Sequence, residues 1–121
     1  MAPSYDSELA KKLNLKSGMK VRVVAKPDEV TLEGLSTTAS GADALIVFVR
    51  TMADADAHSA EVVEAAAAGM VTWMAYPKAR QLGTDLNRDI LWHAMKGRGV
   101  AANRQVSIDD TWSAMRFKAS G

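Results

Sequence analysis

The stretch GMVTWMAYPKARQLGTDLN, residues 69–87, decides the fold of this chain. Its first part, Met70–Tyr76, is apolar and rich in β-branched and aromatic residues, which predicts a buried strand that ends at a proline. Thr84 or Asp85 then supplies a side-chain cap for a helix that continues to about Lys96. A strand followed by a loop and a helix is the unit of α/β proteins, which bind ligands where the strand's carboxyl end meets the helix.

Four other segments have the composition of strands. Ala44–Arg50, ALIVFVR, is a continuous apolar run, which indicates burial on both faces and a central parallel strand. Met19–Ala25 is β-branched and is predicted as the first strand. Val100–Ile108 and Trp112–Lys118 are joined at Asp109–Asp110 and are predicted to form a hairpin.

Two longer helices are predicted between these strands, besides shorter candidates at Asp6–Leu13 and Asp28–Gly34. Asp54–Ala68 ends at Gly69, which is expected to act as a left-handed cap. Its apolar side is predicted from small residues: Ala60, Val63 and Ala67, flanked by Val62 and Ala66. The second helix is expected to turn these residues inward: Leu86, Ile90, Leu91, Ala94 and Met95.

The alternation of strands and helices predicts one α/β domain over residues 1–121. We expect a three-layer, Rossmann-like sheet that is mostly parallel, with helices on both faces and a C-terminal antiparallel hairpin. An antiparallel strand at the end of a parallel sheet also resembles a reduced methyltransferase-type fold. This likeness concerns the fold and carries no function.

Composition excludes several kinds of function. The chain has no Cys, so disulfides, thiol catalysis and thiolate metal sites are excluded, and His58 and His93 are too far apart for metal-ligand spacing. It has no apolar run long enough to span a membrane and no secretory signal pattern, so we expect a cytoplasmic protein without a membrane partner. The net charge of +1 argues against nucleic acid. Residues 1–74 nevertheless carry 7 basic and 10 acidic side chains, whereas residues 75–121 carry 8 basic and 4 acidic.

A basic residue follows each of the three predicted parallel strands: Lys26, Arg50 and Lys78. Because parallel strands end at one edge of a sheet, we expect these cations to form a site for a small anionic ligand. The neighbouring loops are predicted to add further residues: Arg80, Thr84, Asp85, Asp109, Asp110 and Trp112. The alternative is that the cations only solubilise the strand ends or pair with the Asp residues.

A bound nucleotide is not expected. The turn after the first strand reads AKPDEV and lacks the glycines that let the backbone approach a phosphate. A phosphate-loop motif is absent as well, so we predict neither a cofactor nor a metal.

Several motifs along the chain are similar to those of one protein family. They include LAKKLNLKSGMKVRVV, DALIVFVR, WMAYPK, TDLNRDILW and RQVSIDDTWSAMRF. Together they resemble domain of unknown function 3052, a family of small uncharacterised bacterial proteins. The resemblance implies a compact Rossmann-like domain and brings no established activity, cofactor or catalytic residue.

Three functions are left open, and whether the chain is an enzyme is open with them. The first is a non-enzymatic binding or regulatory module with its anion site at the strand-end edge. The second is a small transferase or hydrolase that uses Asp109 or Asp110 as general base. The third is a protein that forms a homodimer through Trp92, which shares the polar face of its helix with Arg88 and Lys96.

Overall fold

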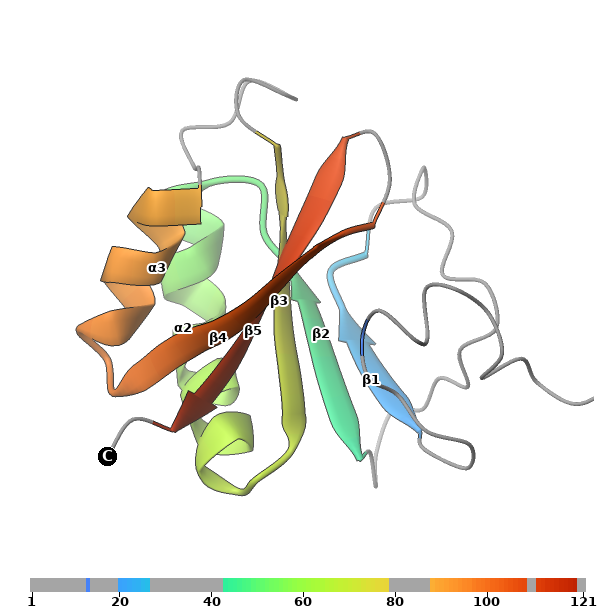
Figure 1. Cartoon of the computed structure of the whole chain (residues 1–121), viewed down its shortest axis with the longest axis vertical. Helices are drawn as coiled ribbons and strands as arrows, with labels where there is room; N and C mark the ends of the chain where they lie inside the picture. Colours follow the sequence, from blue (N-terminus) through green and yellow to red (C-terminus); the bar gives the residue numbers. More distant parts are fainter. Residues whose placement is uncertain (1–12, 14–19, 27–42, 79–87, 109–110, 120–121) are drawn as a thin grey trace, which may run out of the picture.

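The computed structural model describes residues 13, 20–26, 43–78, 88–108 and 111–119. Within these residues the chain forms a five-stranded mixed sheet in the order β1-β2-β3-β5-β4, together with two helices (Figure 1). The elements are β1 (Val21–Val24), β2 (Ala44–Phe48), α2 (Met52–Ala67), β3 (Val71–Pro77), α3 (Arg88–Lys96), β4 (Val100–Ser107) and β5 (Trp112–Ala119).

The sheet combines parallel and antiparallel pairing. Strands β1, β2 and β3 pair in parallel, whereas β5 pairs antiparallel with β3 on one side and with β4 on the other. The antiparallel pairing of the last two strands confirms the prediction. The prediction of a mostly parallel sheet is wrong. Strand β5 lies between β3 and β4 and is antiparallel to both, so two of the four strand pairings are antiparallel.

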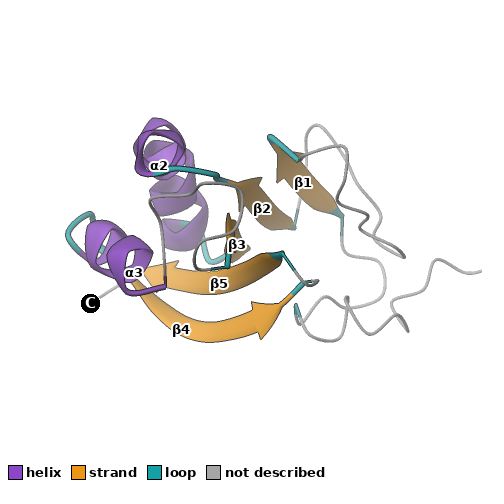
Figure 2. Ribbon diagram, turned by 90° about the horizontal axis from the view of Figure 1, so that it is seen from above, coloured by secondary structure: helices purple, strands orange, loops and turns teal. Residues whose placement is uncertain are grey.

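Both α2 and α3 cover the same face of the sheet (Figure 2). The connections β2–α2–β3 and β3–α3–β4 each join strands that run in the same direction, and both move across the sheet in the same sense. Right-handed connections of this kind place their helices on one face. We predicted helices on both faces of the sheet, but the two helices that the structure describes cover only one face.

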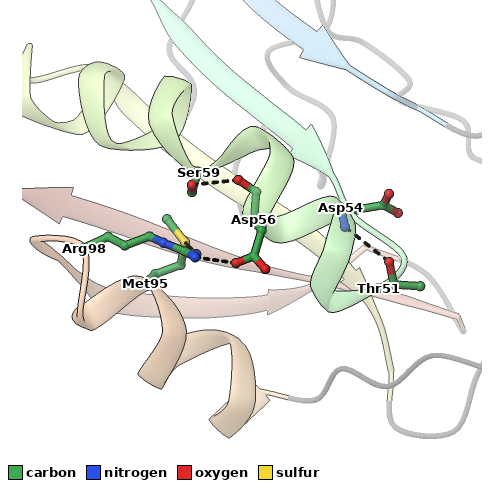
Figure 3. Close-up of polar contacts among 6 residues, drawn as sticks. All are labelled: Thr51, Asp54, Asp56, Ser59, Met95 and Arg98. Atoms are coloured by element: carbon green, nitrogen blue, oxygen red, sulfur yellow. Dashed lines mark hydrogen bonds and ion pairs between the residues drawn. The ribbon is translucent and has the colours of Figure 1, made fainter.

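Helix α2 begins and ends with hydrogen bonds that its sequence supplies. The Thr51 side chain accepts a hydrogen bond from the Asp54 backbone N–H at 3.2 Å (Figure 3), and the Asp54 carboxylate accepts one from the Arg50 N–H at 3.0 Å. This capping places the helix start two residues before the predicted one. At the other end Gly69 has φ +80°, which confirms the predicted left-handed cap.

The core between the helices and the sheet confirms the predicted side of α2 only in part, since of the predicted residues only the flanking Val62 and Ala66 are buried. The helix buries Ala55, Val62, Ala65 and Ala66. Ala60 and Ala67 are exposed, and Val63 is only partly buried. Ala55, Val62 and Ala66 are spaced by seven and four residues, as on one side of a helix, and a run of alanines offers no difference in size from which to predict that side.

A second core lies on the opposite face of the sheet. The Trp73 and Trp112 side chains are fully buried there, and the Phe48 and Trp112 rings meet edge to face with centroids 5.3 Å apart. Trp73 Nε1 donates a hydrogen bond to the Leu13 carbonyl at 3.0 Å. Both tryptophans are therefore core residues of this face. All five residues of β2 are buried, as expected of a central strand.

Candidate functional site

The structure brings a group of polar side chains together on the helix-covered face, at the carboxyl ends of β3 and β4. The Tyr76 hydroxyl accepts a hydrogen bond from Gln105 Nε2 at 2.8 Å. In the strand register Ser113 lies opposite Tyr76, and Ser107 lies opposite Ser113. Lys78 Nζ donates a hydrogen bond to Ser107 Oγ at 2.9 Å. Three strands, β3, β4 and β5, thus contribute to one polar cluster.

A pocket of about 280 Å³ opens beside this cluster, between α3 and the two antiparallel strands. We call it the α3–β4 pocket. It is lined by Arg88, Asp89 and Trp92 from α3, by Ala102, Arg104 and Gln105 from β4, and by Met115 from β5. Gln105 belongs to both the pocket and the polar cluster, so a ligand in the pocket is close to the Tyr76 hydroxyl.

Burial raises the pKa of the Tyr76 phenol above its ordinary value of 10.0. The positive charge of Arg88 and the side-chain hydrogen bonds with Gln105 and Ser113 act to lower that pKa, but burial outweighs them. The negative charge of Asp89 adds a smaller upward effect. The phenol is therefore neutral at neutral pH and acts as a hydrogen-bonding group rather than as a base.

Two guanidinium groups line the α3–β4 pocket and differ in their partners. Arg88 Nε lies 3.2 Å from Asp89 Oδ1, in an ion pair that is exposed to solvent. Arg104 lies directly opposite Arg116 on β5, and within the described part of the chain neither has a carboxylate partner. Like charges facing each other across two strands repel, and an anion bound beside them would relieve that repulsion.

The exposed side of α3 carries the residues predicted for an interface. Trp92 is 36% exposed, Arg88 is also exposed, and Lys96 Nζ lies 5.5 Å from the centre of the Trp92 ring. Burial of Leu91 and Met95 confirms part of the predicted inward face. Ile90 is 42% exposed, so its predicted inward position is wrong.

An ion pair ties the end of α3 to α2. Arg98, in the turn after α3, pairs through its guanidinium with the Asp56 carboxylate on α2 (Figure 3). Its other terminal nitrogen lies 4.0 Å from the sulfur of Met95, a buried residue of α3. These contacts hold the helix that forms one wall of the pocket.

The strand-end cations predicted from the sequence lie where parallel pairing puts them. Lys26, Arg50 and Lys78 follow β1, β2 and β3 on one side of the sheet, and Lys78 is drawn toward β4 by its contact with Ser107. Trp112 begins β5 at this edge, but its side chain is buried in the core. The other predicted members lie outside the described residues: Arg80, Thr84, Asp85, Asp109 and Asp110.

Sequence reasoning missed most residues of the α3–β4 pocket and of the polar cluster. None of the following residues belongs to a recognisable sequence motif: Tyr76, Arg104, Gln105, Ser107 and Ser113. The insertion of β5 between β3 and β4 brings their strands together. The one available signal was the polar run NRQ, residues 103–105, in the middle of a predicted strand.

Other parts of the described structure offer no comparable chemistry. A hollow of about 220 Å³ lies between β1, β2 and α2, where Arg22 and Glu61 form an ion pair at 3.4 Å and His58 Nδ1 lies 2.7 Å from Glu61 Oε1. Within the described ranges no group of three or more His, Cys, Asp or Glu side chains is placed to hold a metal. Neither of the described helices has the length and apolar character needed to cross a membrane.

The chain matches no model of a known protein family, and no curated protein is detectably similar to it. The resemblance to domain of unknown function 3052 is thus carried by the motifs quoted above alone.

Proposed function

We propose that this chain is a non-enzymatic binding or regulatory module whose ligand occupies the α3–β4 pocket. The ligand carries a carboxylate or phosphate and has an apolar part. The observation that carries the proposal is Arg104, a guanidinium without a carboxylate partner in the described chain, in the wall of a pocket that also has apolar lining. Guanidinium groups bind carboxylates and phosphates through paired hydrogen bonds, and Trp92 and Met115 offer the apolar contact.

The size and lining of the pocket support a ligand rather than a packing defect. Its volume of about 280 Å³ is close to the lower end of the range for small-molecule sites, which begins at roughly 300 Å³. Its walls combine apolar side chains with a few polar groups, as such sites do. Gln105 and, behind it, the neutral Tyr76 hydroxyl provide hydrogen bonds that orient a ligand.

The strand-end cations belong to the same proposal. Lys78 reaches Ser107 at the carboxyl end of β4, so the predicted edge and the α3–β4 pocket lie on the same side of the sheet. We propose that Lys26, Arg50 and Lys78 draw anions toward this side, and that Arg88 and Arg104 hold them. Positive charge gathered at one edge raises the local concentration of anions and their rate of binding.

We also propose a specific fold class for this mixed sheet. The insertion of the last strand antiparallel between β3 and β4 supports a Rossmann-like sheet of the reduced methyltransferase type. A single domain of the family of unknown function 3052, acting in the cytoplasm, agrees with this assignment. It adds no catalytic role, since a fold of this class serves many functions.

Titration calorimetry tests the proposal with nucleotides, coenzyme A derivatives and small aromatic or aliphatic carboxylates as probes. We expect at least one probe class to bind, and we expect Arg104→Gln to weaken that binding about tenfold through loss of a charged hydrogen bond. The matched control is Arg22→Gln, which removes an equal charge at the second hollow and leaves the affinity unchanged. Absence of binding, or binding that Arg104→Gln does not alter, would refute this site. Lys78→Ala separates the contribution of the strand-end edge.

A further inference from the structure

Strand β4 forms one edge of the described sheet. It runs for eight residues, Val100–Ser107, and its only strand partner in the sheet order is β5. Arg104, Gln105 and Ser107 are exposed. The outer side of an edge strand presents backbone N–H and C=O groups that can pair with another extended chain.

The two faces of this edge differ in chemistry. On the helix-covered face, Ala102 and Gln105 border the α3–β4 pocket, where Trp92 and Met115 provide apolar surface. On the opposite face, three basic side chains come together across β4 and β5: Arg104, Arg116 and Lys118. Arg116 lies opposite Arg104, and Lys118 is two residues further along β5, so all three project from the same side.

A break in the strand register connects the two faces. The pairing of β4 with β5 shifts between Ala102 and Arg104, as in a β-bulge. A bulge turns the strand locally and re-aims the side chains next to it. This accounts for Arg104, which faces Arg116 in the register and yet also lines the pocket.

We propose that β4 binds an extended acidic peptide as an additional strand of the sheet. Successive side chains of an added strand point to opposite faces, so an apolar side chain enters the α3–β4 pocket while its neighbours on either side meet the basic face. The recognised pattern is therefore an acidic residue, an apolar residue and an acidic residue in succession. This inference rests on the proposed function, because it identifies the pocket's ligand as part of a peptide.

Charge favours an acidic peptide over a second copy of the chain at this edge. Two copies pairing antiparallel about the middle of β4 would bring their Arg104 side chains together, beside Arg116 of each copy. Like charges placed opposite each other in a sheet destabilise the pairing. Carboxylates on an incoming strand instead supply the partners that Arg104 and Arg116 lack within the described residues.

The test compares end-blocked peptides that alternate Glu with Leu against peptides of the same composition in which the Glu residues are grouped. Binding is measured by titration calorimetry, and the contact surface is mapped by amide chemical shifts. We expect the alternating peptide to bind at least about tenfold more tightly, with the largest shifts along β4. N-methylation of alternate peptide amides, in two complementary versions, should abolish binding in only one version, because only every second amide faces the edge.

Variants of the protein complete the test. Arg104→Gln combined with Arg116→Gln should weaken binding of the alternating peptide at least about tenfold, whereas Arg22→Gln should not. Circular dichroism and thermal unfolding establish that each variant is folded. If both peptides bind equally, or if both N-methylated versions bind, the added-strand inference is wrong. If small carboxylates bind in an Arg104-dependent way but the peptide binds no more tightly, the proposed function stands and this inference fails. If neither binds and the nucleotide and coenzyme A probes do not bind either, both fail. A dimer in sedimentation whose amide shifts map to β4 would likewise overturn the inference.

Discussion

Replacing Tyr76 by Phe tests how the hydroxyl between the core and the α3–β4 pocket is held. The substitution keeps the ring, which is 2% exposed, and removes the oxygen that accepts the 2.8 Å hydrogen bond from Gln105. A typical hydrogen bond contributes about 0.5–1.5 kcal/mol to the free energy of unfolding. The amide of Gln105 is exposed and can return to water, whereas the buried Ser113 hydroxyl also loses a partner, so we expect the loss at neutral pH to lie within that range.

The same substitution has an opposite consequence at alkaline pH. Burial raises the folded-state pKa of Tyr76 above 10.0, the value in the unfolded chain. Between these two pKa values the folded protein holds one proton more than the unfolded chain, so the free energy of unfolding falls as pH rises. The slope from this one group approaches about 1.4 kcal/mol per pH unit. A phenylalanine at position 76 does not titrate, so the variant escapes this loss.

Urea unfolding followed by circular dichroism, at several pH values from about 7 to about 11, measures both effects. Lysines lose their charge over the same alkaline range in both proteins, so the informative quantity is the difference between wild type and Tyr76→Phe. We expect wild type to be the more stable below about pH 10 and its advantage to shrink or reverse above it. A difference that stays constant across the whole range would show that the phenol is not kept neutral by burial, and would refute the reasoning.

Three further predictions concern stability, measured by urea unfolding. Ala25 has a left-handed φ of 60°, so Ala25→Gly should raise the free energy of unfolding by up to about 1 kcal/mol and Ala25→Val should lower it; equal values would contradict a strained turn. Trp73→Phe should lower the free energy of unfolding by about 2–4 kcal/mol, because the buried Leu13 carbonyl loses its hydrogen-bond donor and the core side chain becomes smaller. A loss under about 1 kcal/mol would contradict this role of Trp73. A double-mutant cycle of Arg98→Ala and Asp56→Ala should give a coupling of about 0.2–1 kcal/mol, since the pair is partly exposed; zero coupling would show that it does not hold α3.

The central strands could be predicted because their signal is local. The run ALIVFVR matched β2, and Met70–Tyr76 matched β3 to within one residue at each end. A strand buried on both faces must be apolar at every position, so its composition alone marks it. The turn after α2 was predictable for a similar reason, since the left-handed φ at Gly69 strongly favours a residue without a Cβ.

The orientation of the helices could not be predicted to the same degree. In α2 a run of alanines makes two neighbouring sides almost equally apolar, and packing against the sheet selects the side with Val62 rather than the side with Ala60. In α3 the sequence places Ile90 beside Leu91, and only the position of β4 and β5 decides that Leu91 is buried while Ile90 is exposed. Helical periodicity identifies an apolar arc more reliably than its limits.

Strand order lies beyond what local patterns contain. The sequence predicted that the last two strands pair with each other, but a hairpin can join a sheet through either of its strands. The structure pairs β5 with β3, through contacts that include Tyr76 with Ser113. The strand-end cations were predictable because each follows its own strand, whereas the α3–β4 pocket needs α3, β4 and β5 to be in place.

The inserted strand also explains where the positive charge of the second half of the chain gathers. If β4 rather than β5 had paired with β3, β5 would be the edge strand and Arg116 would lie beyond Arg104, away from α3. Because β5 is internal, Arg104 stands at the edge with Arg116 behind it and Arg88 across the pocket. Three guanidinium groups are then close to the β4 edge of the sheet, and only that of Arg88 has a carboxylate partner in the described chain. Charge repulsion of this kind lowers the stability of the free protein, and an anionic partner that binds only the folded state restores it. A rise in melting temperature on adding the alternating Glu–Leu peptide, lost in the Arg104→Gln and Arg116→Gln double variant, is the direct consequence.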